Sequence, residues 1–204
     1  MVRHHSPSLS FEVFPPNPAV GNEKIIQALR EMQDIAPHYI SVTASNNKFN
    51  IEETTVRLAD FIYNDLKIPT IAHLPAVYLT KEMVLDTLQA LDKVGVHKIL
   101  ALRGDIFPDV APKDDFKYAT DLIEYIKEEA PHFDIIGACY PEGHPDSPDR
   151  VSDIRNLKKK VDAGCSSLVT QLFFDNDRFY DFQERCILAG IEVPIHAGIM
   201  PILN

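Results

Sequence analysis

The stretch TIAHLPAVYLTKEMVLDTLQALDKVGVHKILALRGD, residues 70–105, holds a complete strand–helix–strand unit. The apolar runs TIAHL, from Thr70, and KILALR, from Lys98, are each typical of a buried strand. Between them, TKEMVLDTLQALDKVG has the pattern of a helix that takes Thr80 as its N-cap and stops at Gly95. The stretch therefore predicts a βαβ unit with two parallel strands.

The same unit recurs along the whole chain. Helical patterns occupy residues 22–35, 50–66, 80–95, 117–130 and 152–164. Such repeats build a parallel sheet that either winds into an open layer or closes into a barrel. The seven strand-like runs begin at Leu9, Tyr39, Thr70, Lys98, Asp134, Ser167 and Pro194.

Three observations favour the barrel. The repeat is regular, no G-x-G-x-x-G follows the first strand, and polar residues recur where the strands end. We predict the α/β class and a (β/α)8 TIM barrel, as a single domain over residues 1–204. With about seven strands and six helices, we expect this barrel to be incomplete at its C-terminal end, leaving unpaired edges on its first and seventh strands.

The composition limits the classes of binding partner and the cellular compartments that we expect for the protein. The formal net charge is -10 and the pI about 5.2, which argues against nucleic acid or an anionic membrane as partner. The three cysteines form no C-x-x-C pair, which favours a reducing, cytoplasmic location. No apolar run approaches the roughly 18–20 residues that span a bilayer, and the first residues lack the apolar segment of a signal peptide.

Six successive strands end in a side chain that can form hydrogen bonds or ionise. Each has an ordinary structural explanation by itself, such as a satisfied core histidine or a surface ion pair. Because the strand ends of a barrel meet on one face, together they indicate a polar cavity. The residues are Glu12, Thr43, His73, Arg103 with Asp105, Tyr140 and Gln171.

A carboxylate lies inside the first strand, in the run SLSFEVFPP. Alternation places Leu9, Phe11 and Val13 on one face, and Ser10 and Glu12 on the other. We expect the first set to pack on the helices and the second to face the barrel lumen. Burial there raises the pKa of Glu12, so that the side chain can donate a proton near neutral pH.

The strand ends limit the chemistry. None is a lysine, which argues against a Schiff base, and no His-x-His closes the first strand, so no metal site is predicted. The set suits an organic cofactor or substrate held by hydrogen bonds, with one carboxylic acid moving a proton. Asp153, Asn156 and Lys160 share a helix face beside this cavity, and we expect Lys160 to contact a phosphate or ribose.

Eight motifs occur in order: SFEVFPP, ISVT, AHL, ALRGD, YPEGHP, NLKKKVDAG, TQLFFD and AGIMP. With them the chain resembles the methylenetetrahydrofolate reductase family of flavin-dependent enzymes over essentially all of its length. The resemblance implies a (β/α)8 barrel that holds FAD at the C-terminal ends of its strands. It also implies that NADH or NADPH reduces 5,10-methylenetetrahydrofolate to 5-methyltetrahydrofolate through this FAD, in one-carbon metabolism and methionine supply.

The resemblance implies roles for particular residues. Glu12 matches the general acid, Asp105 the acid beside the flavin and the pterin, and Gln171 a further substrate contact. The family often has an aromatic residue and a glycine after Thr43, whereas here Ala44 and Ser45 follow. The positions that match FAD contacts are Thr43, His73, Arg103, Gly104, Asp105, Tyr118, Ala119, Tyr140, His144, Asp153, Asn156 and Lys160.

Two other readings stay open from the sequence. In one, the chain is a truncated, inactive relative or a gene fragment that acts at most as a binding or interaction protein. In the other, it is a different flavin-dependent barrel, such as a proline-dehydrogenase-like enzyme. For the reductase we expect small-molecule partners, namely a folate and a nicotinamide nucleotide, and we consider a homo-oligomer possible.

Overall fold

A computed structural model describes residues 8–16, 23–44, 51–106 and 111–201. It divides into two compact units. The first contains Met1–Leu74 and Tyr78–Lys98, and the second contains Pro75–Val77 and Ile99–Asn204. Ser45, one of the two residues noted after Thr43, lies outside the described residues.

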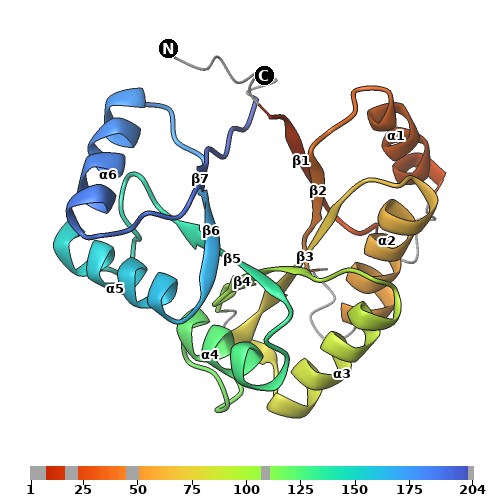
Figure 1. Cartoon of the computed structure of the whole chain (residues 1–204), viewed down its shortest axis with the longest axis horizontal. Helices are drawn as coiled ribbons and strands as arrows, with labels where there is room; N and C mark the ends of the chain where they lie inside the picture. The colour runs from red at the N-terminus through yellow and green to blue at the C-terminus, as the bar shows by residue number, and fades with distance from the viewer. Residues whose placement is uncertain (1–7, 17–22, 45–50, 107–110, 202–204) are drawn as a thin grey trace. The chain divides into compact units, whose positions relative to one another are not determined.

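The first unit carries three parallel strands, β1 (Ser10–Val13), β2 (Tyr39–Val42) and β3 (Thr70–Pro75), whose last residue belongs to the second unit. Glu12 pairs in register with Ser41, and Ile40 pairs with Thr70. Figure 1 shows the helices of this unit along one side of its strands. They are α1 (Glu23–Gln33), α2 (Arg57–Asp60) between π-helical turns at Glu52–Val56 and Phe61–Asp65, and α3 (Lys81–Lys93).

The second unit carries β4 (Lys98–Leu102), β5 (Asp134–Cys139), β6 (Cys165–Thr170) and β7 (Ile195–His196), apart from Lys98, which belongs to the first. β5, β6 and β7 pair in parallel and in sequence order. Its helices are α4 (Ala119–Glu129), α5 (Arg150–Asp162) and α6 (Asn176–Leu188). Residues from β5, β6, α5, α6 and the turn after α6 form one buried apolar cluster: Cys139, Ile154, Leu157, Leu168, Phe182, Cys186 and Ile191.

The alternation predicted from the sequence is confirmed, with a strand at each of the seven predicted places. The boundaries of α3 follow the predicted signals. Thr80 Oγ1 accepts a hydrogen bond from the Met83 amide at 3.2 Å, and Gly95 ends the helix at a φ of +79°. No helix in the described part of the chain is both long and apolar enough to cross a membrane.

Two local predictions are wrong. The helix expected to start at Ser152 starts at Arg150, because the Asp149 carboxylate accepts the Ser152 amide at 2.7 Å and caps the helix two residues earlier. Leu9, expected to pack on helices, is 52 % exposed because it precedes β1 rather than lying within it. Val13, at the other end of the strand, is buried as predicted.

Candidate functional site

Glu12, Thr43 and His73 lie at or near the carboxyl ends of the three strands of the first unit, as predicted. The Oε2 atom of Glu12 lies 3.6 Å from the Nε2 atom of His73. β2 runs between their strands, so the two side chains approach each other across its end. The structure therefore brings these two predicted residues together.

Burial acts on both groups of this pair. It lowers the pKa of His73 from 6.5 to about 4, so the imidazole is neutral at pH 7. It also raises the pKa of Glu12, whose side chain is nevertheless 50 % exposed. A distance of 3.6 Å is longer than a hydrogen bond, so the two groups form neither a hydrogen bond nor an ion pair at neutral pH. Glu12 thus has the shift predicted for an acid, and it can still be reached from solvent.

The backbone of Thr43 is hydrogen-bonded at both its amide and its carbonyl, whereas its hydroxyl is not hydrogen-bonded to any described residue. Its amide donates to the Val13 carbonyl at 3.0 Å, and its carbonyl accepts the Thr55 hydroxyl at 3.0 Å. Its own Oγ1 atom is buried without a hydrogen-bond partner among the described residues, and so is His73 Nε2. Buried polar atoms are normally paired, so these two are candidates for contact with a ligand.

In the second unit, Arg103, Gly104 and Asp105 follow β4. Gly104 has a φ of +89°, and an added Cβ would lie 3.0 Å from the Pro75 Cβ, so only glycine fits this turn without strain. Asp105 beyond it is exposed. Arg103 forms an ion pair with a residue of another loop, because its Nη1 atom lies 2.8 Å from Oδ2 of Asp146.

The loop after β5 holds two further predicted residues and one that sequence reasoning missed. The rings of Tyr140 and His144 meet edge to face, with centroids 4.5 Å apart. The Asp146 amide donates to His144 Nδ1 at 3.0 Å, and the Asp146 carboxylate accepts from Arg103. The sequence signal that could have indicated Asp146 is its position in HPDSPD. There, two prolines flank Asp146 and Ser147, next to the predicted cofactor residue His144.

The three predicted residues of α5 have different surroundings. Asp153 Oδ1 accepts the Ser147 hydroxyl at 3.2 Å, and Asn156 is exposed. Lys160 Nζ donates to the Ala138 carbonyl at 2.7 Å, and burial lowers the pKa of this amine. The amine of Lys160 is therefore bound to the backbone of β5.

The remaining predicted residues lie at element ends of the second unit. Tyr118 precedes α4 and is 52 % exposed, whereas Ala119, the first residue of that helix, is buried. Gln171 follows β6, and its Oε1 accepts the Leu172 amide at 2.9 Å. This bond leaves the amide NH2 group of Gln171 to donate to a ligand.

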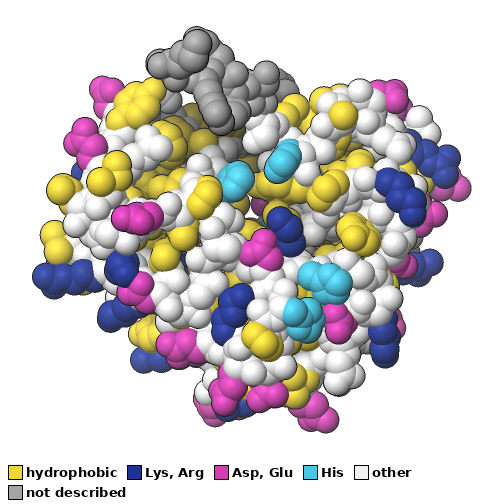
Figure 2. All heavy atoms as spheres, in the orientation of Figure 1, with side chains coloured by type: hydrophobic (Ala, Val, Ile, Leu, Met, Phe, Trp, Pro, Cys, Tyr) yellow, Lys and Arg dark blue, Asp and Glu magenta, His cyan; other side chains and the backbone are white. Residues whose placement is uncertain are grey.

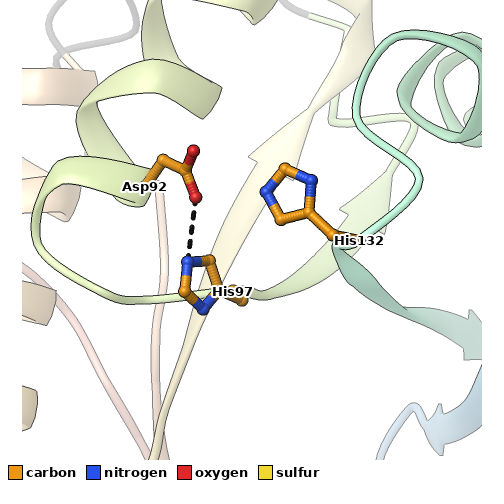
Figure 3. A group of neighbouring side chains, drawn as sticks. All are labelled: Asp92, His97 and His132. Carbon is orange, nitrogen blue, oxygen red and sulfur yellow. Dashed lines mark hydrogen bonds and ion pairs between the residues drawn. The ribbon is translucent and has the colours of Figure 1, made fainter.

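Acidic and basic side chains are interspersed over the visible face of the described residues (Figure 2). Figure 3 shows a surface pair of the first unit, in which His97 Nε2 lies 2.9 Å from Oδ1 of Asp92. His132, also drawn there, belongs to the second unit, where its ring lies 4.7 Å from that of Phe133.

Solved structures establish the fold class. A 2,3-dimethylmalate lyase of the PEP mutase/isocitrate lyase superfamily matches 97 % of this chain and 70 % of its own, with a TM-score of 0.63 and 12 % identity. QR15, an aldolase, matches 94 % of this chain and 80 % of its own, with a TM-score of 0.60 and 11 % identity. These likenesses concern the fold alone, and they confirm the predicted α/β class of the TIM-barrel type.

Sequence comparison then gives the family. The family model for methylenetetrahydrofolate reductase matches residues 1–204. The 5,10-methylenetetrahydrofolate reductases of Pectobacterium carotovorum and Escherichia coli are each 34 % identical over 197 residues, covering 97 % of this chain and 65 % of theirs. The chain belongs to the methylenetetrahydrofolate reductase family, as its motifs indicated, and it spans 65 % of the length of these relatives.

Proposed function

We propose that this chain belongs to an enzyme that reduces 5,10-methylenetetrahydrofolate to 5-methyltetrahydrofolate, using FAD and either NADH or NADPH. Family membership supports the reaction class, and the Glu12–His73 arrangement is the observation that carries the mechanism. The folate and the nicotinamide nucleotide are the small-molecule partners in this proposal.

Glu12 is the proposed general acid. Burial raises the pKa of its carboxyl, and the nearby imidazole of His73 is neutral, so this ring adds no positive charge that would stabilise the carboxylate. Its proton would pass from the carboxyl oxygen to the folate nitrogen whose bond to the bridging carbon breaks as the five-membered ring opens. The 50 % exposure of the side chain allows contact with a substrate.

FAD, when bound, supplies the hydride carrier between the nicotinamide and the folate. The described residues fit such a group in each unit separately. In the first, Thr43 Oγ1 and His73 Nε2 are buried polar atoms without a hydrogen-bond partner among the described residues. In the second unit, Arg103 Nε is likewise buried without a hydrogen-bond partner among the described residues. Such atoms support the assignment of these residues to cofactor binding.

The other cofactor residues in this proposal are Gly104, Asp105, Tyr118, Ala119, Tyr140, His144, Asp153, Asn156 and Lys160. Asp105 would oppose negative charge on the reduced cofactor and favour a cationic folate intermediate. Gln171 would donate its NH2 group to the folate. Lys160 Nζ donates one of its three N–H groups to the Ala138 carbonyl, and the other two would be available to a phosphate or ribose of the cofactor.

Location and assembly are part of the same proposal. The three cysteines are buried and form no disulfide, which supports a reducing compartment such as the cytoplasm. A homo-oligomer remains a prediction, to be checked by light scattering of the purified chain.

The experiment is reconstitution with FAD followed by turnover. We expect the folded chain to become yellow with a flavin absorbance band, and to oxidise NADH or NADPH when 5,10-methylenetetrahydrofolate is added. Proline is the control substrate, and its turnover in place of the folate would contradict the proposal. A folded chain that takes up no FAD would contradict it equally and would leave the reading of an inactive binding protein.

A further inference from the structure

We propose that Asp146 is a positioning residue that presets the Arg103 guanidinium for the cofactor. This inference rests on the proposed function, because Arg103 acts there as a cofactor contact. Both residues lie in the second unit, and their side chains meet at 2.8 Å between Arg103 Nη1 and Asp146 Oδ2. Neither the strand-end pattern nor the family motifs singled out Asp146.

One nitrogen of the Arg103 guanidinium forms an ion pair, and another has no hydrogen-bond partner among the described residues. The side chain is 30 % exposed, and its Nη1 atom is bound to the carboxylate. Its Nε atom is buried and donates to no described acceptor. A guanidinium offers five N–H donors in a rigid plane, so fixing one nitrogen sets the direction of the others. The bond to Asp146 therefore orients the donors that remain for a ligand.

Hydrogen bonds within the loop hold the backbone at Asp146 independently of the ion pair. The Gly143 amide donates to the Tyr140 carbonyl at 3.0 Å, and the Ser147 amide donates to the His144 carbonyl at 2.9 Å. The Asp146 amide donates to His144 Nδ1 at 3.0 Å, so this ring nitrogen carries no proton. The acidic residue is thus bound through its own backbone.

Two more features stiffen the same loop. Pro145 and Pro148 flank the dipeptide Asp146–Ser147 and restrict its backbone. The Ser147 hydroxyl donates to Asp153 Oδ1 at 3.2 Å, which ties the loop to the first turn of α5. Because the short Asp146 side chain stands on a fixed backbone and Arg103 is long and flexible, the carboxylate positions the guanidinium and not the reverse.

The guanidinium also keeps the carboxylate ionised. Its hydrogen bond and its charge hold the pKa of Asp146 below the ordinary value. The pair therefore persists at neutral pH, where cofactor binding takes place.

The test compares Asp146→Asn and Asp146→Glu with the wild-type chain. Glu142→Gln is the matched control, because it removes the same charge from an exposed position in the same loop. Dissociation constants are measured for FAD, by flavin fluorescence, and for ADP, which lacks the flavin ring. We expect Asp146→Asn to weaken both by about ten-fold, Asp146→Glu to restore most of the loss, and Glu142→Gln to stay within roughly two-fold. Equal or tighter binding by Asp146→Asn would overturn the inference and would mean that the carboxylate competes with the cofactor for Arg103.

A second readout needs no cofactor. Hydrogen exchange of the Arg103 Nε–H is followed by NMR in arginine-labelled protein. We expect exchange about five-fold faster or more in Asp146→Asn, because the released guanidinium samples exposed rotamers. Unchanged exchange would overturn the positioning role even if no variant bound FAD. Failure of the wild-type chain to bind FAD or ADP, with faster exchange in Asp146→Asn, would contradict the proposed function and leave the positioning role standing.

Discussion

The Nε2 atom of His73 lies 3.6 Å from the Oε2 atom of Glu12, with the imidazole buried and the carboxyl half exposed. A histidine that close to a carboxylate usually carries a charge. Here burial lowers the pKa of His73 to about 4, so the imidazole stays neutral and does not draw the proton off the acid. The raised pKa of Glu12 therefore persists beside a basic group, which is the condition that a proton donor needs.

Glu12→Gln tests the role of the acid. The change keeps the size of the side chain and removes its proton, so we expect folate reduction to fall by about 10²–10⁴-fold. Reduction of the bound flavin by NADH or NADPH requires no proton from Glu12 and should be retained. Stopped-flow absorbance measures the two half-reactions separately, and an equal loss of both would give Glu12 a structural role.

His73 predicts how stability depends on pH. Burial lowers the pKa of His73 from 6.5 to about 4, so between these values the unfolded chain binds a proton that the folded chain does not. The free energy of unfolding should therefore increase by about 3 kcal/mol, for this group, as the pH is raised from 4 to 6.5. The same amount is lost when the pH is lowered over this range. Urea unfolding at a series of pH values measures the slope, and His73→Gln should flatten it.

The control for this slope is His38→Gln, which changes an exposed histidine of the same unit. Glu12 contributes with the opposite sign, because its pKa is raised and the stability that it gives is lost as the pH rises. An unchanged slope in His73→Gln would mean that His73 is solvated in the folded chain.

Gly137→Ala tests the packing of Lys160 against β5. An added Cβ would lie 2.9 Å from Lys160 Cδ, 3.0 Å from Cys165 Sγ and 3.1 Å from Leu168 Cδ2. We expect a loss of about 1–3 kcal/mol in the free energy of unfolding, because this site has no room. The loss should shrink in a Lys160→Ala background, where one contact is gone, and strict additivity in the double-mutant cycle would contradict the contact.

Thr80 allows a test of local structure away from the site. Its Oγ1 caps α3, so Thr80→Ala should cost about 1 kcal/mol of stability. Thr80→Ser keeps the oxygen and should lose much less. Denaturant unfolding measures both variants, and equal losses would show that the methyl group rather than the cap matters.

The positions of the strands and the polar character of the residues at their ends could be predicted from the sequence, because both follow from local patterns. The position of Glu12 and His73 near the ends of their strands could be predicted because each lies within an apolar run. Their approach to 3.6 Å could not, because it depends on the register of β1 and β3 against β2. Asp146 was missed for a related reason. Its partner Arg103 follows β4, whereas Asp146 lies in the loop after β5, and only the folded chain brings the two charges together.

The three buried cysteines give the second unit an internal reporter. Burial raises the pKa of Cys165 and of Cys186 to about 11 each and raises that of Cys139 further, so very little thiolate exists at neutral pH. An alkylating reagent can then react only when the structure around a thiol opens. The rate of alkylation at each cysteine, followed by mass spectrometry, would therefore give the free energy of local opening of β5, β6 and α6 without any introduced label.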